Sequence, residues 1–183
     1  MLASQSPRRR DLLKLVGLRF EVEAAAVDEA FPAGLAPAEG AMAIAEKKVK
    51  YIAENYDEAF IVGADTIVVL ENHILGKPAN REMAFEMLKQ LSGKTHEVYT
   101  GIAVLQLPEN RLVRAVECTR VTFRHLEDQE ILEYVASGEP MDKAGAYGIQ
   151  DQSAVFVEKI NGCFYNVVGF PLARFYQVCK SYF

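Results

Sequence analysis

Asp65 stands where the sequence is otherwise apolar. It directly follows residues 60–64 (FIVGA), a run that is typical of a strand buried in the middle of a sheet. A carboxylate in such a core is destabilising unless it is paired or coordinated, and open α/β sheets place their sites at the ends of central strands. Asp65 is therefore a candidate general base or metal ligand. The alternative is a structural aspartate that caps the end of the strand.

Three arginines occupy the first turn of a helix that the sequence predicts near the N-terminus. Ser6 and Pro7 are typical N-cap and first-turn residues, and Arg8, Arg9 and Arg10 follow them. Free N–H groups and the positive end of the helix dipole make cations unfavourable there unless an anion is bound. The pattern predicts that Arg8 and Arg9 contact a phosphate or a nucleobase. The alternative is a solvated basic face.

Other basic residues could add counter-charge for a triphosphate. Lys77 stands in a stiff Gly-Lys-Pro turn after a strand, and Lys47, Lys48 and Lys50 lie together on a predicted helix. Each lysine is by itself a weak indication, because most lysines are solvated. Several converging cations, however, suit an anionic ligand.

A glycine-rich loop over residues 142–150 (DKAGAYGIQ) could bring the backbone close to a ligand. Gln150 ends this loop, and its amide both donates and accepts hydrogen bonds, which suits reading the edge of a base. The alternative is a tight structural loop.

Acidic side chains could complete the site. Asp28 and Glu29 would form a small carboxylate set with Asp65, and Mg²⁺ typically takes one or two carboxylates plus substrate phosphates. The sequence contains no G-x-x-x-x-G-K-[ST], G-x-S-x-G or H-E-x-x-H motif, which argues against a Walker-type ATPase, a serine hydrolase and a zincin.

The bulk properties bound the class of protein. The chain has 183 residues, half of them apolar and a quarter charged, which fits one domain or one domain with two lobes. Its formal net charge of −5 gives no general attraction for DNA, RNA or anionic membranes. We find no signal peptide and no apolar run long enough to span a membrane, so we expect a cytoplasmic protein. The three isolated cysteines indicate neither a disulfide framework nor a structural zinc site.

The order of the predicted elements indicates an α/β protein with a mixed sheet flanked by helices. A short helix ends near Gly17, and a final helix begins at Pro171. The predicted inward residues of that final helix are Leu172, Phe175, Val178, Cys179 and Tyr182. The remaining predictions are strands over 20–25, 59–70, 98–107 and 112–125, helices over 39–55, 81–91 and 128–136, and a hairpin of 154–160 with 163–168 around Asn161-Gly162.

Six segments occur in the order of a known family: LASQSPRR, GADTIV, GKP, LSGKTHEVYTG, MDKAGAYGIQ and NVVGFP. They span residues 2 to about 171 and resemble the Maf proteins, which are nucleotide pyrophosphatases. The resemblance implies a single Maf-like domain over 1–183, similar to the inosine triphosphate pyrophosphatases, with an elongated twisted sheet and two lobes around a cleft. It also implies a homodimer.

The implied activity is attack of water on the α-phosphorus of a nucleoside triphosphate, which gives the monophosphate and pyrophosphate. A divalent cation such as Mg²⁺, Mn²⁺ or Co²⁺ is implied as cofactor, with Asp28 and Asp65 as its ligands. Asp65 occupies the position of the proton acceptor. Asp28 stands where a close relative has Glu, so this chain departs from the pattern there.

The same resemblance implies residues that bind the substrate. The subfamily that acts on dTTP and UTP carries Arg, Thr and Gln at the positions of Arg8, Thr66 and Gln150. The further positions assigned to the substrate are Ser6, Arg9, Lys48 and Lys77.

Two alternatives remain open. One is a different substrate, 7-methyl-GTP or another modified nucleotide; the 7-methyl-GTP subfamily carries an aromatic residue, Gln and Glu at the three specificity positions. The other is a regulatory binding protein in septum formation and cell division. The expected role is house-cleaning of dTTP, UTP and modified pyrimidine nucleotides, with no membrane and no nucleic-acid polymer required as partner.

Overall fold

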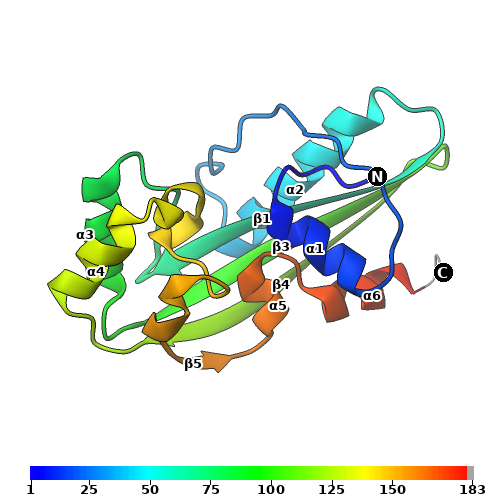
Figure 1. The fold of residues 1–183 in the computed structure, drawn as a ribbon. Helices are drawn as coiled ribbons and strands as arrows, with labels where there is room; N and C mark the ends of the chain where they lie inside the picture. The colour runs from blue at the N-terminus through cyan, green and yellow to red at the C-terminus, as the bar shows by residue number, and fades with distance from the viewer. Residues whose placement is uncertain (181–183) are drawn as a thin grey trace. The chain divides into compact units, whose positions relative to one another are not determined.

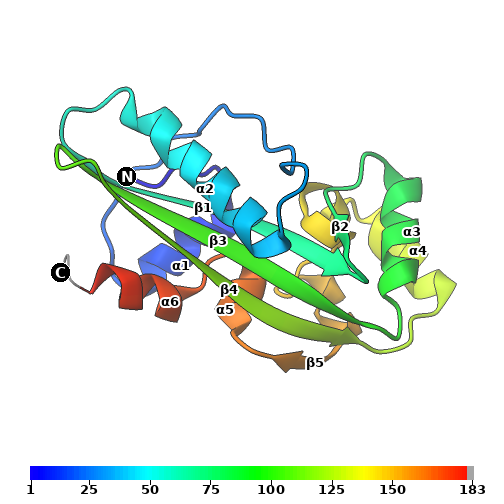
Figure 2. The same ribbon diagram turned by 180° about the vertical axis from the view of Figure 1, so that it is seen from behind.

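The computed structural model describes residues 1–180 and contains a five-stranded sheet in the order β2-β1-β3-β4-β5 (Figure 1). The strands are β1 (Ala59–Leu70), β2 (His73–Leu75), β3 (Thr95–Leu107), β4 (Arg111–Phe123) and β5 (Val157–Asn161). The edge strands β2 and β5 pair antiparallel with β1 and β4, and Figure 2 shows β1 and β3 running in opposite directions. Parallel pairing within residues 1–180 is confined to isolated bridges of Leu2 with Val22 and Val62. The predicted α/β class and the sheet flanked by helices are confirmed.

Six α-helices accompany these strands in the described part of the chain. They are α1 (Pro7–Leu15), α2 (Pro37–Ala53), α3 (Arg81–Leu91), α4 (Asp128–Ala136), α5 (Phe164–Val168) and α6 (Leu172–Cys179). The predictions over 81–91 and 128–136 match α3 and α4. Asn80 caps α3 by accepting a 2.8 Å hydrogen bond from the Met83 amide. Glu127 and Glu130 form a capping box at α4.

The chain divides into two compact units. The first comprises Met1–Thr66, Thr100–Glu117 and the residues from Gly169 onward, and the second comprises Ile67–Tyr99 and Cys118–Val168. The strands β1, β3 and β4 therefore each contribute residues to both units. The expectation of one domain over 1–183 stays a prediction.

In the first unit, α2 packs closely on β1 and β3 (Figure 2). Ala45, Val49 and Ile52 of α2 are fully buried against Ile61 and Ala103 of the strands. Helix α1 lies on the opposite face of the sheet (Figure 1). The strands of this unit thus present one face to each helix, and alternate residues of β1 meet different helices.

In the second unit, α3 packs against α4, and an aromatic cluster fills the core (Figure 1). Phe123 makes edge contacts with His96 and Tyr147 at centroid distances of 5.0 and 4.8 Å. Phe156 in turn meets Tyr134 at 5.4 Å. These rings tie the ends of β3 and β4 to the segment that follows α4.

Two local predictions were wrong. Residues 20–25 form no strand: Val22 makes only an isolated parallel bridge with Leu2. The hairpin after 154 is also absent. Residues Gln152–Phe156 form a 3-10 helix, and α5 replaces the second strand. A type I′ turn needs positive φ at both central residues, and of Asn161 and Gly162 only the glycine has it.

Side-chain hydrogen bonds explain the missing second strand of that hairpin. The Thr119 hydroxyl accepts from the Cys163 amide at 3.0 Å, and the Asn166 amide donates to the Val98 carbonyl at 2.9 Å. Side chains thereby replace a ladder of backbone bonds in this segment. The final helix agrees with the prediction, with Leu172, Phe175 and Cys179 buried. Of the other predicted inward residues, Val178 is half-buried and Tyr182 lies outside the described residues.

Candidate functional site

The centre of the candidate site is the pair of neighbouring residues Asp65 and Thr66 in β1. Both lie in the middle of this strand of 12 residues. The sequence had predicted Asp65 at the end of a central strand, and that placement was wrong. Side chains alternate along a strand. The Asp65 carboxylate meets Lys48 from α2, and the Thr66 hydroxyl meets Arg9 from α1. Each of the two residues is therefore held by a different helix.

Lys48 is buried and fully engaged by acceptors. Its ammonium nitrogen lies 2.7 Å from Asp65 Oδ1 and 2.9 Å from Glu29 Oε1, and it donates to the Ala64 carbonyl at 3.4 Å. The side chains of Lys48 and Asp65 are only 5% and 11% exposed. A buried ion pair of this kind needs close geometry and further hydrogen bonds to offset its desolvation. The third acceptor supplies such a bond.

Two glycines explain how α2 comes close enough for this pair to form. A Cβ on Gly63 would lie 2.8 Å from the Ala45 carbonyl oxygen and 3.5 Å from Cβ of Lys48. A Cβ on Gly101 would overlap the backbone of Ala41. The helix backbone therefore rests directly on β1 and β3, and the lysine stem passes over Gly63 toward Asp65.

The acid that joins Asp65 is Glu29. Its carboxylate shares the Lys48 ammonium with Asp65 and is 45% exposed. The side chain of Asp28, the predicted metal ligand, instead accepts a hydrogen bond from the Ala30 amide at 2.9 Å, and its backbone carbonyl accepts from Lys47. Both acids were expected near Asp65, and the contact with Lys48 is made by Glu29.

Arg9 binds several parts of the first unit together. Its Nε donates to the Gly169 carbonyl at 2.9 Å, Nη1 to the Ser4 hydroxyl at 3.3 Å, and Nη2 to the Thr66 hydroxyl at 3.1 Å. Gly169 has φ of +119° and approaches both Arg9 and Thr66, so that a side chain there would be strained. The NVVGFP segment thus supplies a backbone acceptor at this site.

The pKa of Arg9 depends on its burial and on the charged residues around it. Burial lowers the pKa of Arg9 from its ordinary value, the carboxylates of Asp65 and Glu29 oppose this shift, and Arg8 adds to the lowering. An arginine stays charged across the physiological range even with a lowered pKa. The site therefore combines buried positive and negative charge.

Thr66 is hydrogen-bonded on two sides. Besides Arg9, its hydroxyl meets the hydroxyl of Thr100 at 2.9 Å, and Thr100 is fully buried. Arg9 can only donate. When Thr100 also donates, both lone pairs of the Thr66 oxygen are occupied, and its proton is left for a ligand. Thr66 itself is half-buried.

The remaining predicted residues lie in different parts of the chain. Ser6 precedes α1 and its amide donates to the Ser4 hydroxyl at 3.2 Å, while Arg8 is half-buried in the first turn of α1. Lys77 and Gln150 belong to the second unit, where both side chains are exposed. In the first unit the structure thus brings Lys48, Asp65, Arg9 and Thr66 into two adjoining networks.

Sequence reasoning missed Ser4, Thr100 and Gly169. All three fall within segments that carry the family resemblance, LASQSPRR, LSGKTHEVYTG and NVVGFP. Small residues of this kind have no chemical signature by themselves. Only their hydrogen bonds with Arg9 and Thr66 reveal a place in the site.

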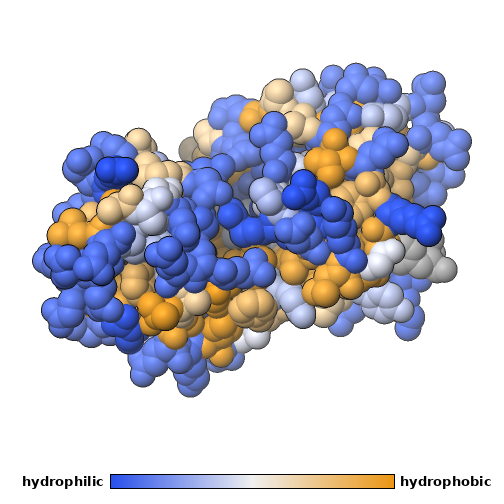
Figure 3. Space-filling model, in the orientation of Figure 1, coloured by the Kyte–Doolittle hydropathy of each residue, from blue (hydrophilic) through white to orange (hydrophobic). Residues whose placement is uncertain are grey.

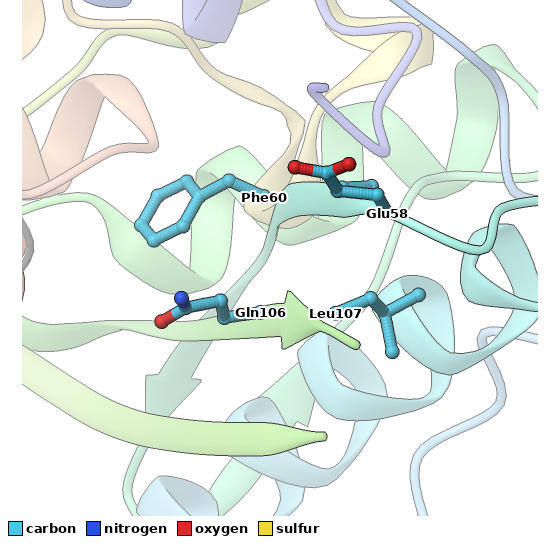
Figure 4. Close-up of a pocket in the computed structure, with 5 residues that line it drawn as sticks. Glu58, Phe60, Gln106 and Leu107 are labelled. Atoms are coloured by element: carbon cyan, nitrogen blue, oxygen red, sulfur yellow. The ribbon is translucent and has the colours of Figure 1, made fainter. Parts of the chain in front are cut away.

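An open surface pocket lies elsewhere in the first unit. It is lined by Glu58, Ala59, Phe60, Gln106 and Leu107, where β1 begins and β3 ends (Figure 4). None of the predicted site residues lines it. We therefore assign the candidate site to the buried charges and not to this pocket.

No α-helix within residues 1–180 has the length and apolar character needed to cross a membrane. The face of the molecule seen in Figure 3 is mostly hydrophilic.

Comparison with known proteins identifies relatives along the whole chain. A family model described as Maf-like protein matches residues 1–182. A protein of Pelotomaculum thermopropionicum named dTTP/UTP pyrophosphatase is 50% identical over 182 residues, which cover 100% of this chain and 95% of that protein. Proteins of the same name from Carboxydothermus hydrogenoformans and Bacillus anthracis are 48% and 47% identical, and the matches cover 99% and 100% of this chain and 97% and 94% of the relatives.

Proposed function

This chain belongs to the Maf-like protein family, and on that premise we propose that it is a nucleoside triphosphate pyrophosphatase that hydrolyses dTTP and UTP to the monophosphate and pyrophosphate. The observation that carries the proposal is the buried Asp65 held at 2.7 Å by Lys48, with Glu29 beside it. A water-activating carboxylate beside concentrated positive charge suits attack on a phosphorus atom.

Asp65 is the proposed proton acceptor. Lys48 occupies its Oδ1 at 2.7 Å, and Oδ2 is the oxygen proposed to receive the proton. One carboxylate oxygen is thus fixed in place and the other can take a proton from the attacking water. A carboxylate anchored in this way loses little orientational freedom when substrate binds.

The carboxylates also fit a divalent cation. Asp65 and Glu29 each place an oxygen within 3 Å of the same ammonium nitrogen, and Mg²⁺ commonly takes one or two carboxylates plus substrate phosphates. Within residues 1–180 no larger cluster of acidic, histidine or cysteine side chains forms a metal site. Asp65 and Glu29 are therefore the proposed ligands, with Asp28 as the ligand implied by the resemblance. A bound cation would neutralise the charge that builds on the leaving pyrophosphate.

The basic residues divide into two roles. Three nitrogens of Arg9 and the ammonium of Lys48 already bond to protein groups, so these two residues chiefly position Thr66 and Asp65. Arg8, Ser6 and the amides of the first turn of α1 are the proposed contacts of the triphosphate in this unit. The family resemblance adds Lys77 to them.

Thr66 is the proposed base-reading residue of the first unit. Its hydroxyl accepts from Arg9 and shares a hydrogen bond with Thr100. When Thr100 is the donor of that bond, the Thr66 hydroxyl donates to a carbonyl oxygen of the base, and both uracil and thymine carry such oxygens. The resemblance assigns the same role to Arg8 and Gln150. A cytoplasmic location and a homodimer are also proposed on the basis of the resemblance, and sedimentation of the purified protein tests the homodimer.

Pyrophosphate release from a panel of nucleoside triphosphates, with Mg²⁺ and with Mn²⁺, tests the proposal. Turnover of dTTP and UTP should exceed that of GTP and ATP. Equal rates for all four would contradict the pyrimidine preference, and a preference for 7-methyl-GTP would assign the chain to the other subfamily. Absence of pyrophosphate release with every substrate would favour the regulatory alternative.

A further inference from the structure

The loop that carries Gln150 is anchored through the next residue, Asp151. One oxygen of the Asp151 carboxylate, Oδ1, accepts from the Ser153 hydroxyl at 2.7 Å and from the Ser153 amide at 2.9 Å. The other, Oδ2, lies 3.3 Å from the Lys143 ammonium. The Tyr134 hydroxyl lies 3.2 Å from both oxygens. Asp151 therefore joins α4, the segment at Lys143 and the loop itself.

Ser153 closes the loop on the other side of Gln150. Its hydroxyl accepts from the Gly148 amide at 3.0 Å and is 2.9 Å from the Gly148 carbonyl oxygen. Ser153 is fully buried. Gly148 and Ser153, which flank Gln150, are thus hydrogen-bonded to each other. The exposed side chain of Gln150 stands at the tip of the turn that they close.

The space beside Gly148 in this turn is filled by Asp151 and Lys143. A Cβ on Gly148 would lie 2.5 Å from Asp151 Oδ2 and 2.7 Å from Cε of Lys143. The side chains of Lys143 and Asp151 are 12% and 17% exposed. A charge pair that is largely removed from solvent is costly to break, because one charge is left uncompensated. Lys143 and Asp151 therefore hold the turn in one position against the protein.

A second contact fixes the beginning of the same loop. The Tyr147 hydroxyl lies 2.8 Å from Nε2 of His96, and both side chains are buried. The backbone on the N-terminal side of Gln150 is therefore anchored to β3, and the backbone on its C-terminal side to α4 through Asp151 and Tyr134.

We propose that Asp151, acting through Lys143 and Ser153, is the positioning residue that sets the place and orientation of Gln150 for recognition of the pyrimidine base. This inference rests on the proposed function, in which Gln150 reads the base. A side chain that reads hydrogen bonds discriminates only when it is held at the correct distance, and a displacement of about 1 Å can cost about 100-fold in rate. Asp151 itself need not touch the nucleotide.

A double-mutant cycle tests the proposal. We expect Asp151→Ala to lower kcat/KM for dTTP about tenfold or more, mainly by raising KM, and to reduce the preference for dTTP over dCTP. In a Gln150→Ala background the same change should alter kcat/KM by less than about twofold, because its effect acts through Gln150. Asp151→Asn keeps an acceptor for Ser153 and should retain part of the wild-type preference.

Asp142→Asn is the matched control. Asp142 also lies 3.0 Å from the Lys143 ammonium, but its side chain is 63% exposed, against 17% for Asp151, so its ion pair with Lys143 is far more solvated. This variant should leave the base preference unchanged. Circular dichroism and thermal unfolding of each variant would establish that the fold is retained.

The outcomes separate the two proposals. Wild-type protein that releases no pyrophosphate from any nucleotide would reject the proposed function and with it the role of Gln150. Wild-type protein that is active and pyrimidine-selective, with Asp151→Ala and Gln150→Ala lowering kcat/KM independently, would reject only the positioning role of Asp151. An unchanged dTTP preference in Asp151→Ala would have the same consequence.

Discussion

The ammonium of Lys48 lies 2.7 Å from a carboxylate oxygen of Asp65, and solvent reaches little of either side chain. Lysine and aspartate are 17 residues apart in the chain and meet because α2 rests on β1 over Gly63. Such a pair serves structure and chemistry together: it holds a carboxylate in place, and it leaves an uncompensated charge if either partner is removed.

Replacement of Asp65 by Asn should abolish pyrophosphate release almost completely while the fold is retained. Asparagine can still accept a hydrogen bond from Lys48, but it cannot take up the proton of the attacking water. A coupled assay for pyrophosphate with dTTP, together with circular dichroism, measures both properties. An Asp65→Asn variant that keeps most of its activity would remove Asp65 from the mechanism.

Replacement of Lys48 by Met should lower the free energy of unfolding by about 3–5 kcal/mol, because it leaves the buried Asp65 carboxylate without its partner. Lys50→Met is the matched control on the same helix. Its ammonium pairs with Glu46 at 2.6 Å, but the lysine side chain is 61% exposed, and an exposed pair contributes about 1 kcal/mol or less. Urea unfolding gives the free energy of unfolding of both variants. Equal losses in the two variants would show that the buried Lys48 pair stabilises the protein no more than the exposed Lys50 pair does.

Replacement of Gly101 by Ala should destabilise the protein by about 1–3 kcal/mol or more, since the new Cβ overlaps the backbone of Ala41 and the helix must move. That movement should also displace Lys48 and lower activity. At Gly76 a Cβ would meet no atom within 4 Å, so Gly76→Ala serves as the control for stability. Unchanged thermal unfolding of the Gly101→Ala variant would show that α2 is not held as closely as the structure indicates.

Replacement of Thr100 by Val should weaken discrimination between dTTP and dCTP about three- to tenfold, because Thr66 loses the hydrogen bond that orients its hydroxyl beside Arg9. The maximal rate should change less than this ratio. Thr95 and Thr122 form a similar hydroxyl pair at 2.8 Å on the exposed part of the sheet, so Thr95→Val is the control. Equal selectivity in wild type and Thr100→Val would contradict this role.

Stability should fall as the pH is lowered from 6.5 toward 4, because of His96. Burial lowers the pKa of His96 to about 4 from the ordinary 6.5, and the side chain is 1% exposed. Between these values the unfolded chain binds a proton that the folded protein does not, so the free energy of unfolding decreases with falling pH, by up to about 3 kcal/mol. Above pH 6.5 this contribution is fully present.

Urea unfolding of wild type and His96→Gln across that pH range isolates the effect. The variant is expected to be less stable at neutral pH, because it loses the contact with Tyr147, but its stability should depend less steeply on pH. His73→Gln, at an exposed position, should keep the wild-type slope. The same slope in wild type and His96→Gln would assign the acid sensitivity to other groups.

Much of the architecture could be predicted from local pattern. The apolar run around Asp65 identified β1, and Asn80 with the periodic residues after it identified α3 with the correct bounds. These elements were predictable because propensity, capping and hydrophobic period agree within one short segment. Phe164–Val168 form the helix α5 instead of a strand, and Thr119 and Asn166 hold this segment through contacts distant in sequence.

The sequence by itself determined the family, through six segments in order, and the type of chemistry, through a carboxylate in an apolar strand and arginines at a helix start. Only the tertiary structure decided which acid joins Asp65 at Lys48, and that Thr66 is held by Arg9 and Thr100. The reason is physical: periodicity reports which face of an element is buried, whereas a pairing between distant segments depends on how closely their backbones approach. Gly63 and Gly101 set that approach for α2, and without them Lys48 would not reach Asp65.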